Sequence, residues 1–163
     1  MFKNKIKIQK IDVYSLVLIL FIFGIDRISK IYIIQTIQLE GSDIFLYDFL
    51  NLTLNWNRGI AFGLLSSNAN LFYHIVSALI LLIIVYLIYL MVTSDNFGKI
   101  IISFIVGGAI GNVYDRFTYF AVPDFIDFHI DDFHWFTFNF ADVFISLGIF
   151  VMILKEFLLR KKI

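Results

Sequence analysis

The chain has 163 residues, of which 60% are hydrophobic and 18% aromatic, and its basic and acidic side chains balance to a net charge of zero. A soluble domain of this length is nearer half apolar, so the composition favours lipid as the solvent for much of the chain. The neutral balance argues against nucleic acid as a partner. The absence of cysteine excludes disulfides, thiolate chemistry and Cys-based zinc sites.

The first predicted element is a retained membrane-spanning helix over residues 13–34. Lys3, Lys5, Lys7 and Lys10 precede it and resemble the basic start of a signal peptide. The apolar stretch is longer than a usual signal-peptide core, and no small-residue cleavage site follows it. We therefore expect this segment to stay in the mature protein and to cross the membrane.

A small β-sheet is predicted in the first loop, residues 35–70. From Leu50 to Asn57, apolar residues alternate with Asn and Thr, and a period of two indicates a strand with one apolar and one amide-lined face. Because an isolated strand is unstable, we expect it to pair with residues 44–49 in a sheet that rests on the membrane surface.

Three further apolar segments complete the predicted fold, at residues 71–92, 100–117 and 141–159. Between the last two lies a second loop, residues 118–140, rich in aromatic, acidic and histidine side chains. No internal repeat or linker divides the chain. The sequence thus predicts an all-α membrane protein of one domain, residues 1–163, with four transmembrane helices and a small extracytoplasmic sheet between the first and second.

The distribution of basic residues predicts the orientation. Cytoplasmic loops carry an excess of Lys and Arg, and the two long loops here contain only Arg58 among these residues. Both termini and the short middle loop are therefore expected in the cytoplasm, and the long loops outside. The remaining flanking basic residues are Lys3, Lys5, Lys7, Lys10, Lys99, Lys155, Arg160, Lys161 and Lys162.

Polar residues interrupt three of the predicted spans near their outer ends. Ionisable side chains inside a span are costly and are functional candidates by default. Within each span they are three and four residues apart, which places them on one helical face. Three polar faces at one depth predict a shared pocket between the helices. The residues are Asp26, Ser29 and Lys30; Asn112, Asp115 and Arg116; and Asn139, Asp142 and Ser146.

The third span also carries Gly107, Gly108 and Gly111. Small residues four apart let another helix backbone approach closely in a membrane. We interpret these glycines as a packing surface.

Five short strings occur in order along the chain. They are Asp26-x-x-Ser29-Lys30, Asn57-Arg-Gly59-Ile-Ala61-Phe62, Gly107-Gly108-Ala109-x-Gly111-Asn112-x-x-Asp115-Arg116, Val122-Pro-Asp124-Phe125 and Phe138-Asn139-Phe-Ala141-Asp142. In order and spacing they resemble the lipoprotein signal peptidases, the bacterial signal peptidase II family. The resemblance covers about residues 13–160 and includes the four-span topology. One departure is Pro123, where the family commonly has a small aliphatic residue, followed by an aromatic and acidic insert at residues 127–135.

The resemblance implies a role for each polar residue. Asp124 and Asp142 match the catalytic pair of an aspartyl endopeptidase that cuts prolipoproteins before a diacylglyceryl-modified cysteine. It also implies a monomer in the bacterial cytoplasmic membrane, with its active site at the outer face, lipid and lipid-modified prolipoproteins as partners, and no cofactor or metal. Substrate-site positions are matched by Asn57, Asn112, Arg116 and Asn139, and structural polar positions by Asp26, Lys30 and Asp115.

Two other functions remain open at this point. A metal-dependent membrane hydrolase could use the acidic loop at residues 124–134, although its spacing fits no familiar metal signature. A small transporter or assembly subunit could bind an ion in the pocket, although the fourth span carries no charge between Asp142 and Lys155. The non-catalytic interpretations of the two aspartates are a solvated loop acid at residue 124 and a helix cap at residue 142. The loop's candidate ligands are Asp127, His129, Asp131, Asp132 and His134.

Overall fold

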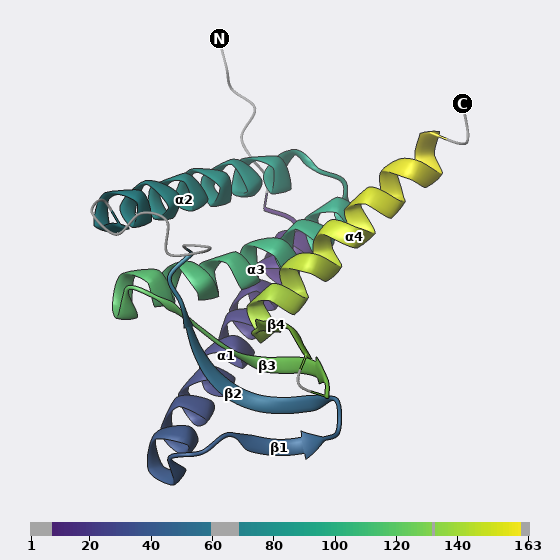
Figure 1. The fold of residues 1–163 in the computed structure, drawn as a ribbon. Coiled ribbons are helices and arrows are strands. Elements are labelled where there is room, and N and C mark those ends of the chain that lie inside the picture. Colours follow the sequence, from purple (N-terminus) through teal and green to yellow (C-terminus); the bar gives the residue numbers. More distant parts are fainter. Residues whose placement is uncertain (1–7, 60–68, 132, 161–163) are drawn as a thin grey trace.

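The structure, a computed structural model, describes residues 8–59, 69–131 and 133–160 (Figure 1). Several residues used above lie outside these ranges, among them the lysines before residue 8, Ala61 and Phe62 of one motif, Asp132, Lys161 and Lys162. The elements are, in chain order, α1 (Lys10–Glu40), β1 (Ile44–Tyr47), β2 (Leu50–Asn57), α2 (Ala69–Thr93), α3 (Asn96–Tyr119), β3 (Val122–Ile130), β4 (Phe133–Phe138) and α4 (Phe140–Arg160).

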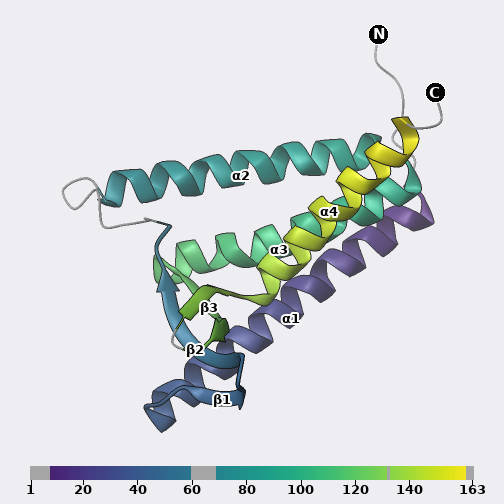
Figure 2. The ribbon, with the colours of Figure 1, turned by 45° about the vertical axis from the view of Figure 1, so that its right-hand side comes forward.

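Helix α3 is the centre of the helical part. It packs against α1, α2 and α4, whereas α2 contacts mainly α3 and lies to one side of the other helices (Figure 2). This position explains why α3 buries residues around its whole circumference, including Ile105, Val106 and Val113. Helix α1 is longer than the predicted span and ends at Gly41, whose φ of 68° is the left-handed conformation that glycine adopts without strain.

The glycines of α3 make the close packing possible. A Cβ at Gly108 would lie 2.5 Å from the carbonyl oxygen of Ala141 in α4, and a Cβ at Gly111 would lie 2.5 Å from the Asp26 carboxylate in α1. Both distances are too short for any side chain. The packing interpretation of the glycines is therefore confirmed, and it brings the first turn of α4 and the Asp26 carboxylate against α3.

Two of the four predicted spans have the length and apolar composition of membrane helices in the described part of the chain, Tyr73–Thr93 of α2 and the whole of α3. Helices α1 and α4 are also long and expose large apolar side chains such as Phe21 and Phe150. Each carries more charge along its length than α2 or α3, however. The charged residues are Lys10, Asp12, Asp26, Arg27, Lys30 and Glu40 in α1, and Asp142, Lys155, Glu156 and Arg160 in α4.

The sheet is larger than predicted. Ile44 pairs with Leu52 in an antiparallel β1–β2 pair, as expected. The sheet continues, however, into the second long loop, and its four antiparallel strands follow the order β1-β2-β3-β4. The prediction of a sheet confined between the first two helices is thus wrong in its extent.

Strand β3 escaped prediction because its first part does not alternate. It is buried from Val122 to Phe125 on both faces, so apolar and polar residues do not follow a period of two there. Pro123 also argues against a central strand. The structure resolves this conflict, since β4 pairs with β3 only from Ile126 onward and leaves the edge of β3 free around the proline.

Candidate active site

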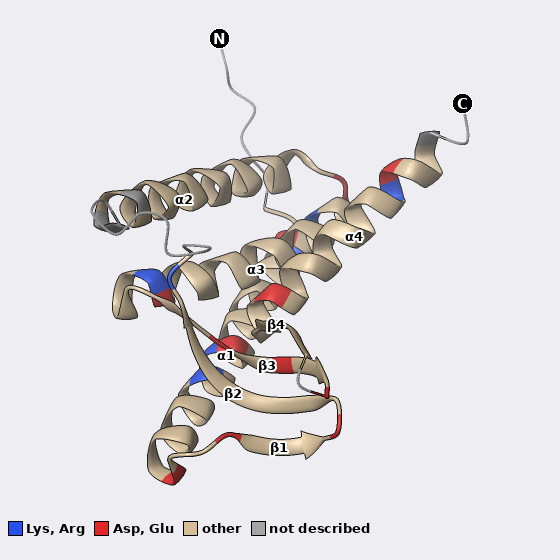
Figure 3. Cartoon of the chain, viewed as in Figure 1, with Lys and Arg blue, Asp and Glu red and all other residues tan. Residues whose placement is uncertain are grey.

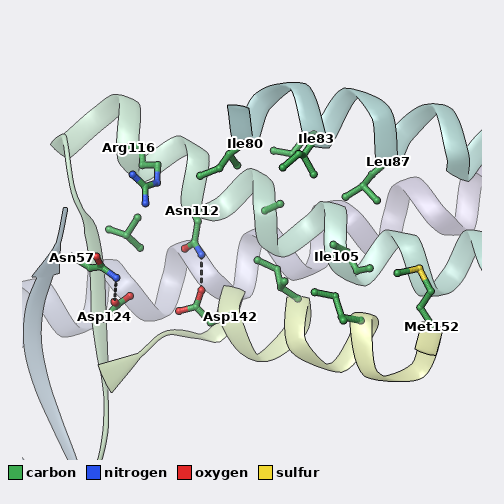
Figure 4. Close-up of a pocket in the computed structure, with 15 residues that line it drawn as sticks. Asn57, Ile80, Ile83, Leu87, Ile105, Asn112, Arg116, Asp124, Asp142 and Met152 are labelled. Carbon is green, nitrogen blue, oxygen red and sulfur yellow. Dashed lines mark hydrogen bonds between the residues drawn. The ribbon is translucent and has the colours of Figure 1, made fainter. Parts of the chain in front are cut away.

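Asp124 and Asp142, predicted as a pair, lie at the same cavity (Figure 4). Asp124 projects from β3 and is only 3% exposed, so the interpretation as a solvated loop acid is wrong. Asp142 is in the first turn of α4. Asn139, which is fully buried, contacts both: its Nδ2 donates to Asp124 Oδ1 at 2.6 Å, and its backbone N–H donates to Asp142 Oδ2 at 3.1 Å.

The first turn of α4 is held by a capping box. Asn139 Oδ1 accepts from the backbone N–H of Asp142 at 3.1 Å, while Asp142 Oδ2 accepts the reciprocal bond from the Asn139 backbone. The helix-cap interpretation of Asp142 is therefore correct for one of its oxygens. The other oxygen, Oδ1, faces the cavity and accepts from Asn112 Nδ2 at 2.7 Å. Capping thus orients this carboxylate without occupying it fully.

Each of the four carboxylate oxygens of the pair accepts one N–H bond, and the last of these comes from Asn57 Nδ2 to Asp124 Oδ2 at 2.9 Å. The pKa of Asp124 is raised to about 6: burial is the largest cause and the neighbouring Asp142 charge adds to it, while the hydrogen bonds from Asn57 and Asn139 act in the opposite direction. The carboxyl group of Asp124 therefore exchanges its proton near neutral pH, which suits acid–base chemistry.

Behind the pair lies a second group of charges, contributed by α1 and α3. The Lys30 ammonium is completely buried and bonds Asp26 Oδ2 at 2.9 Å and Asp115 Oδ2 at 2.7 Å. Arg27 Nη2 lies 2.6 Å from Asp115 Oδ1. Figure 3 shows basic and acidic segments next to each other on α1 and at the end of α3, and an acidic segment at the start of α4. Two acids and two bases neutralise each other here, as a low-dielectric setting requires.

This charged group is connected to the pair in two ways. Lys30 Nζ donates to Asn112 Oδ1 at 2.9 Å, and Asn112 in turn bonds Asp142. Asp26 Oδ1 accepts from the backbone N–H of Ala141 at 3.1 Å, which supplies α4 with a cap from a different helix. The predicted convergence of polar faces is thereby present as a set of direct contacts.

Arg116 lies at the rim of the same cavity. Its guanidinium stacks over the Tyr73 ring, with Cζ 5.3 Å from the ring centroid, and is held close to Gly59, where a Cβ would lie 3.0 Å from Nη2. Among the described residues, no acid forms an ion pair with Arg116, and its Nη1 is buried without a hydrogen-bond partner. A buried, unused cationic donor at a cavity is suited to binding an oxygen of a ligand.

The cavity runs from these polar groups along α2, α3 and α4 and has a volume of about 450 Å³. Its polar end holds Asn57, Asn112, Arg116, Asp124 and Asp142, and the remainder is apolar (Figure 4). The apolar walls are Ile80, Ile83, Ile84 and Leu87 of α2, Ile105 and Ala109 of α3, Val122 of β3, and Ile145, Ile149 and Met152 of α4.

The acidic loop forms no metal centre in the described part of the chain, where no three of its His, Asp and Glu side chains converge as ligands. Asp127 is instead buried and bonds His134 Nδ1 at 2.7 Å, across the β3–β4 pair. Two residues of the predicted polar faces also lie elsewhere. Ser29 bonds the backbone of its own helix, and Ser146 faces a second cavity, which Phe136, Phe138 and also Asp142 line.

The contribution of α2 was not predicted. Its isoleucines form one wall of the cavity, but in the sequence they are indistinguishable from the lipid-facing residues of the same apolar helix. Arg27 was not among the predicted site residues, and its pairing with Asp115 depends on the approach of α1 to α3.

Comparison with known proteins finds relatives that match nearly the whole chain. A family model described as signal peptidase (SPase) II matches residues 18–158. The lipoprotein signal peptidase of Pelagibacter ubique is 47% identical over 98% of this chain and 96% of its own length. That of Anaplasma phagocytophilum is 38% identical over 93% of this chain and 95% of its own length.

Solved structures agree with the fold. One chain described as a bacterial membrane enzyme is 31% identical, covers 87% of this chain and 91% of its own length, and superposes with a TM-score of 0.72. A second, described in the same way, is 29% identical over 91% of this chain and 89% of its own length, with a TM-score of 0.70.

Proposed function

We propose that this chain, which belongs to the signal peptidase II family, is an aspartyl endopeptidase whose catalytic pair is Asp124 and Asp142. The function of the family is the removal of signal peptides from prolipoproteins, and the chain performs it. The observation that carries the proposal is the position of both carboxylates at the polar end of one largely apolar cavity, linked through Asn139. Such a cavity suits a substrate that is part lipid and part peptide.

The chemistry follows from two carboxylates that share one proton. Like charges held near each other do not both ionise readily, so the pair retains a proton, and its titration belongs to the pair as a whole. The ionised member accepts a proton from water, and the protonated member donates to the scissile carbonyl oxygen. The N–H donors of Asn57, Asn112 and Asn139 hold both carboxylates in fixed orientations during this exchange.

Arg116 supplies a substrate contact beside the asparagines. The free Nη1 of Arg116 is available for a backbone carbonyl of the substrate or for the negative charge that develops on the scissile oxygen. The apolar walls between α2 and α4 accommodate hydrocarbon, which supports cleavage before a diacylglyceryl-modified cysteine whose lipid chains remain in the membrane.

The membrane arrangement belongs to the same proposal. The family acts in the bacterial inner membrane, and the basic residues flanking the helices favour cytoplasmic termini and an active site at the outer face. Helices α1 and α4 would then cross the membrane together with α2 and α3. Their charged residues support this arrangement, because Asp26, Arg27 and Lys30 are buried between helices and hidden from lipid. The whole chain forms one catalytic domain and acts as a monomer.

A cleavage assay tests this function. The purified chain is incubated with one prolipoprotein in lipidated and unlipidated forms, each with and without EDTA. We expect cleavage of the lipidated form alone, at the residue before the modified cysteine, and the same rate in EDTA. Cleavage abolished by EDTA would favour the metal-dependent hydrolase, and no cleavage of either form would favour a non-enzymatic role.

A further inference from the structure

The three asparagines at the catalytic pair share one feature: a group that can only donate fixes the orientation of each amide. Asn57 Oδ1 accepts from the backbone N–H of Gly59 at 2.7 Å. Asn139 Oδ1 accepts from the backbone N–H of Asp142. Because a backbone N–H cannot accept a hydrogen bond, the amide oxygen must face it, and the NH₂ group must face the other way, toward a carboxylate.

Asn112 follows the same rule, but its oxygen is held by a side chain. Lys30 Nζ donates to Asn112 Oδ1 at 2.9 Å, and Asn112 Nδ2 donates to Asp142 Oδ1 at 2.7 Å. An ammonium has three donors and no acceptor, so it also excludes the flipped amide. A flipped Asn112 would present its carbonyl oxygen to the Asp142 carboxylate, and two acceptors would then repel each other.

The Lys30 ammonium is itself unable to move away. Its three N–H groups match three acceptors, Asp26 Oδ2, Asp115 Oδ2 and Asn112 Oδ1, and the side chain is completely buried. Arg27 supplies a second cation to the same two acids. The charges of Asp26 and Asp115 are therefore neutralised by Arg27 as well as by Lys30, whereas Lys30 alone among the described residues donates to the Asn112 oxygen.

We propose that Lys30 is a positioning residue of the peptidase, whose buried ammonium fixes the Asn112 amide so that its NH₂ group orients Asp142 toward the substrate. This inference rests on the proposed catalytic pair and adds a function for a residue that the sequence assigned only to structure. Lys30 does not touch the reacting atoms; it acts through Asn112. Its loss should slow the chemical step and leave substrate binding nearly unchanged, because the cavity walls stay in place.

A double-mutant cycle tests the coupling between Lys30 and Asn112. The variants are Lys30→Met, Asn112→Ala and the combination, each assayed for kcat and KM with a lipidated prolipoprotein. We expect Lys30→Met to lower kcat by about 10- to 100-fold, the range typical of lost outer-shell orientation, with KM changed less than about twofold. In the Asn112→Ala background, we expect Lys30→Met to lower kcat hardly at all. An equal fall in both backgrounds would overturn the proposal, as would a full kcat for Lys30→Met.

A charge-compensated background keeps the test decisive if Lys30→Met alone does not fold. Asp115→Asn combined with Lys30→Met removes one acid and one base, so the net charge of the buried group is unchanged. Arg27 still pairs with Asp26 in this background. The cycle is then repeated with all variants carrying Asp115→Asn, after thermal unfolding has confirmed that they fold. Failure of the catalytic pair itself would be distinct, since Asp142→Asn would then remain active whatever the cycle shows.

Discussion

Two pairs of aspartates lie at the same end of the helices and are held in opposite ways. Asp26 and Asp115 are fully buried and face the charged ends of Lys30 and Arg27. Asp124 and Asp142 face the amides of asparagines, and among the described residues no lysine or arginine forms an ion pair with either.

The difference supports the proposal that Asp124 and Asp142, rather than Asp26 and Asp115, carry out the chemistry. Ion pairs with Lys30 and Arg27 tie Asp26 and Asp115 into the packed helices, which suits a structural function. Neutral amides orient Asp124 and leave its carboxyl group able to take up and release a proton near neutral pH, as its pKa of about 6 indicates. The same residue type is therefore suited to structure or to chemistry according to its partner.

Removing one acid of the ion-paired group tests whether that group is structural. Asp115→Asn leaves the buried Lys30 with one charged partner fewer, and breaking a buried ion pair costs about 3 kcal/mol. We expect the midpoint of thermal unfolding in detergent to fall markedly, while the folded fraction still cleaves substrate. A variant with unchanged stability and abolished turnover would move Asp115 into the catalytic group.

A smaller effect, on kcat, is expected from substituting Arg116, which contacts neither pair of aspartates through an ion pair among the described residues. Arg116→Lys keeps the charge at the cavity rim but loses the planar fork of donors, so kcat should fall by about 10- to 100-fold with little change in stability. Steady-state kinetics on a lipidated prolipoprotein measures this. A variant with wild-type kcat would assign Arg116 a structural function through its contacts with Tyr73 and Gly59.

The amide contacts predict a shift in the pH profile. Asn57 donates to Asp124 and stabilises its ionised form, so Asn57→Ala should raise the pKa of Asp124 above its value of about 6. The limb on which kcat/KM falls as pH rises through this pKa should therefore move to higher pH, by about one unit. A limb that stays in place, or moves to lower pH, would show that another group controls it.

Much of this arrangement could be read from the sequence because it depends on local periodicity. Hydropathy located the helices, and spacings of three and four placed polar residues such as Asp26 with Lys30 on common faces. The family strings then selected Asp124 and Asp142 from the many acids of the outer loops. The pairing of residues 44–49 with the following strand was also predictable, because a strand indicated by alternation needs a partner.

The remainder depends on contacts between distant segments. Strand β3 does not alternate around Asp124 because it is buried there on both faces. The isoleucines of α2 become a cavity wall only because that helix lies beside α3. The orientation of the Asn112 amide is set by Lys30, 82 residues away, and no local pattern encodes it.

The central claim is that Asp124 and Asp142 both act in catalysis, and turnover of Asp124→Asn and Asp142→Asn tests it most directly. Asp127→Asn is the matched control, since Asp127 is equally buried on the same strand but bonds His134. With each protein shown to fold by thermal unfolding, the account predicts that both catalytic variants lose nearly all cleavage of a lipidated prolipoprotein while Asp127→Asn retains it. Near-normal cleavage by either Asp124→Asn or Asp142→Asn would contradict it.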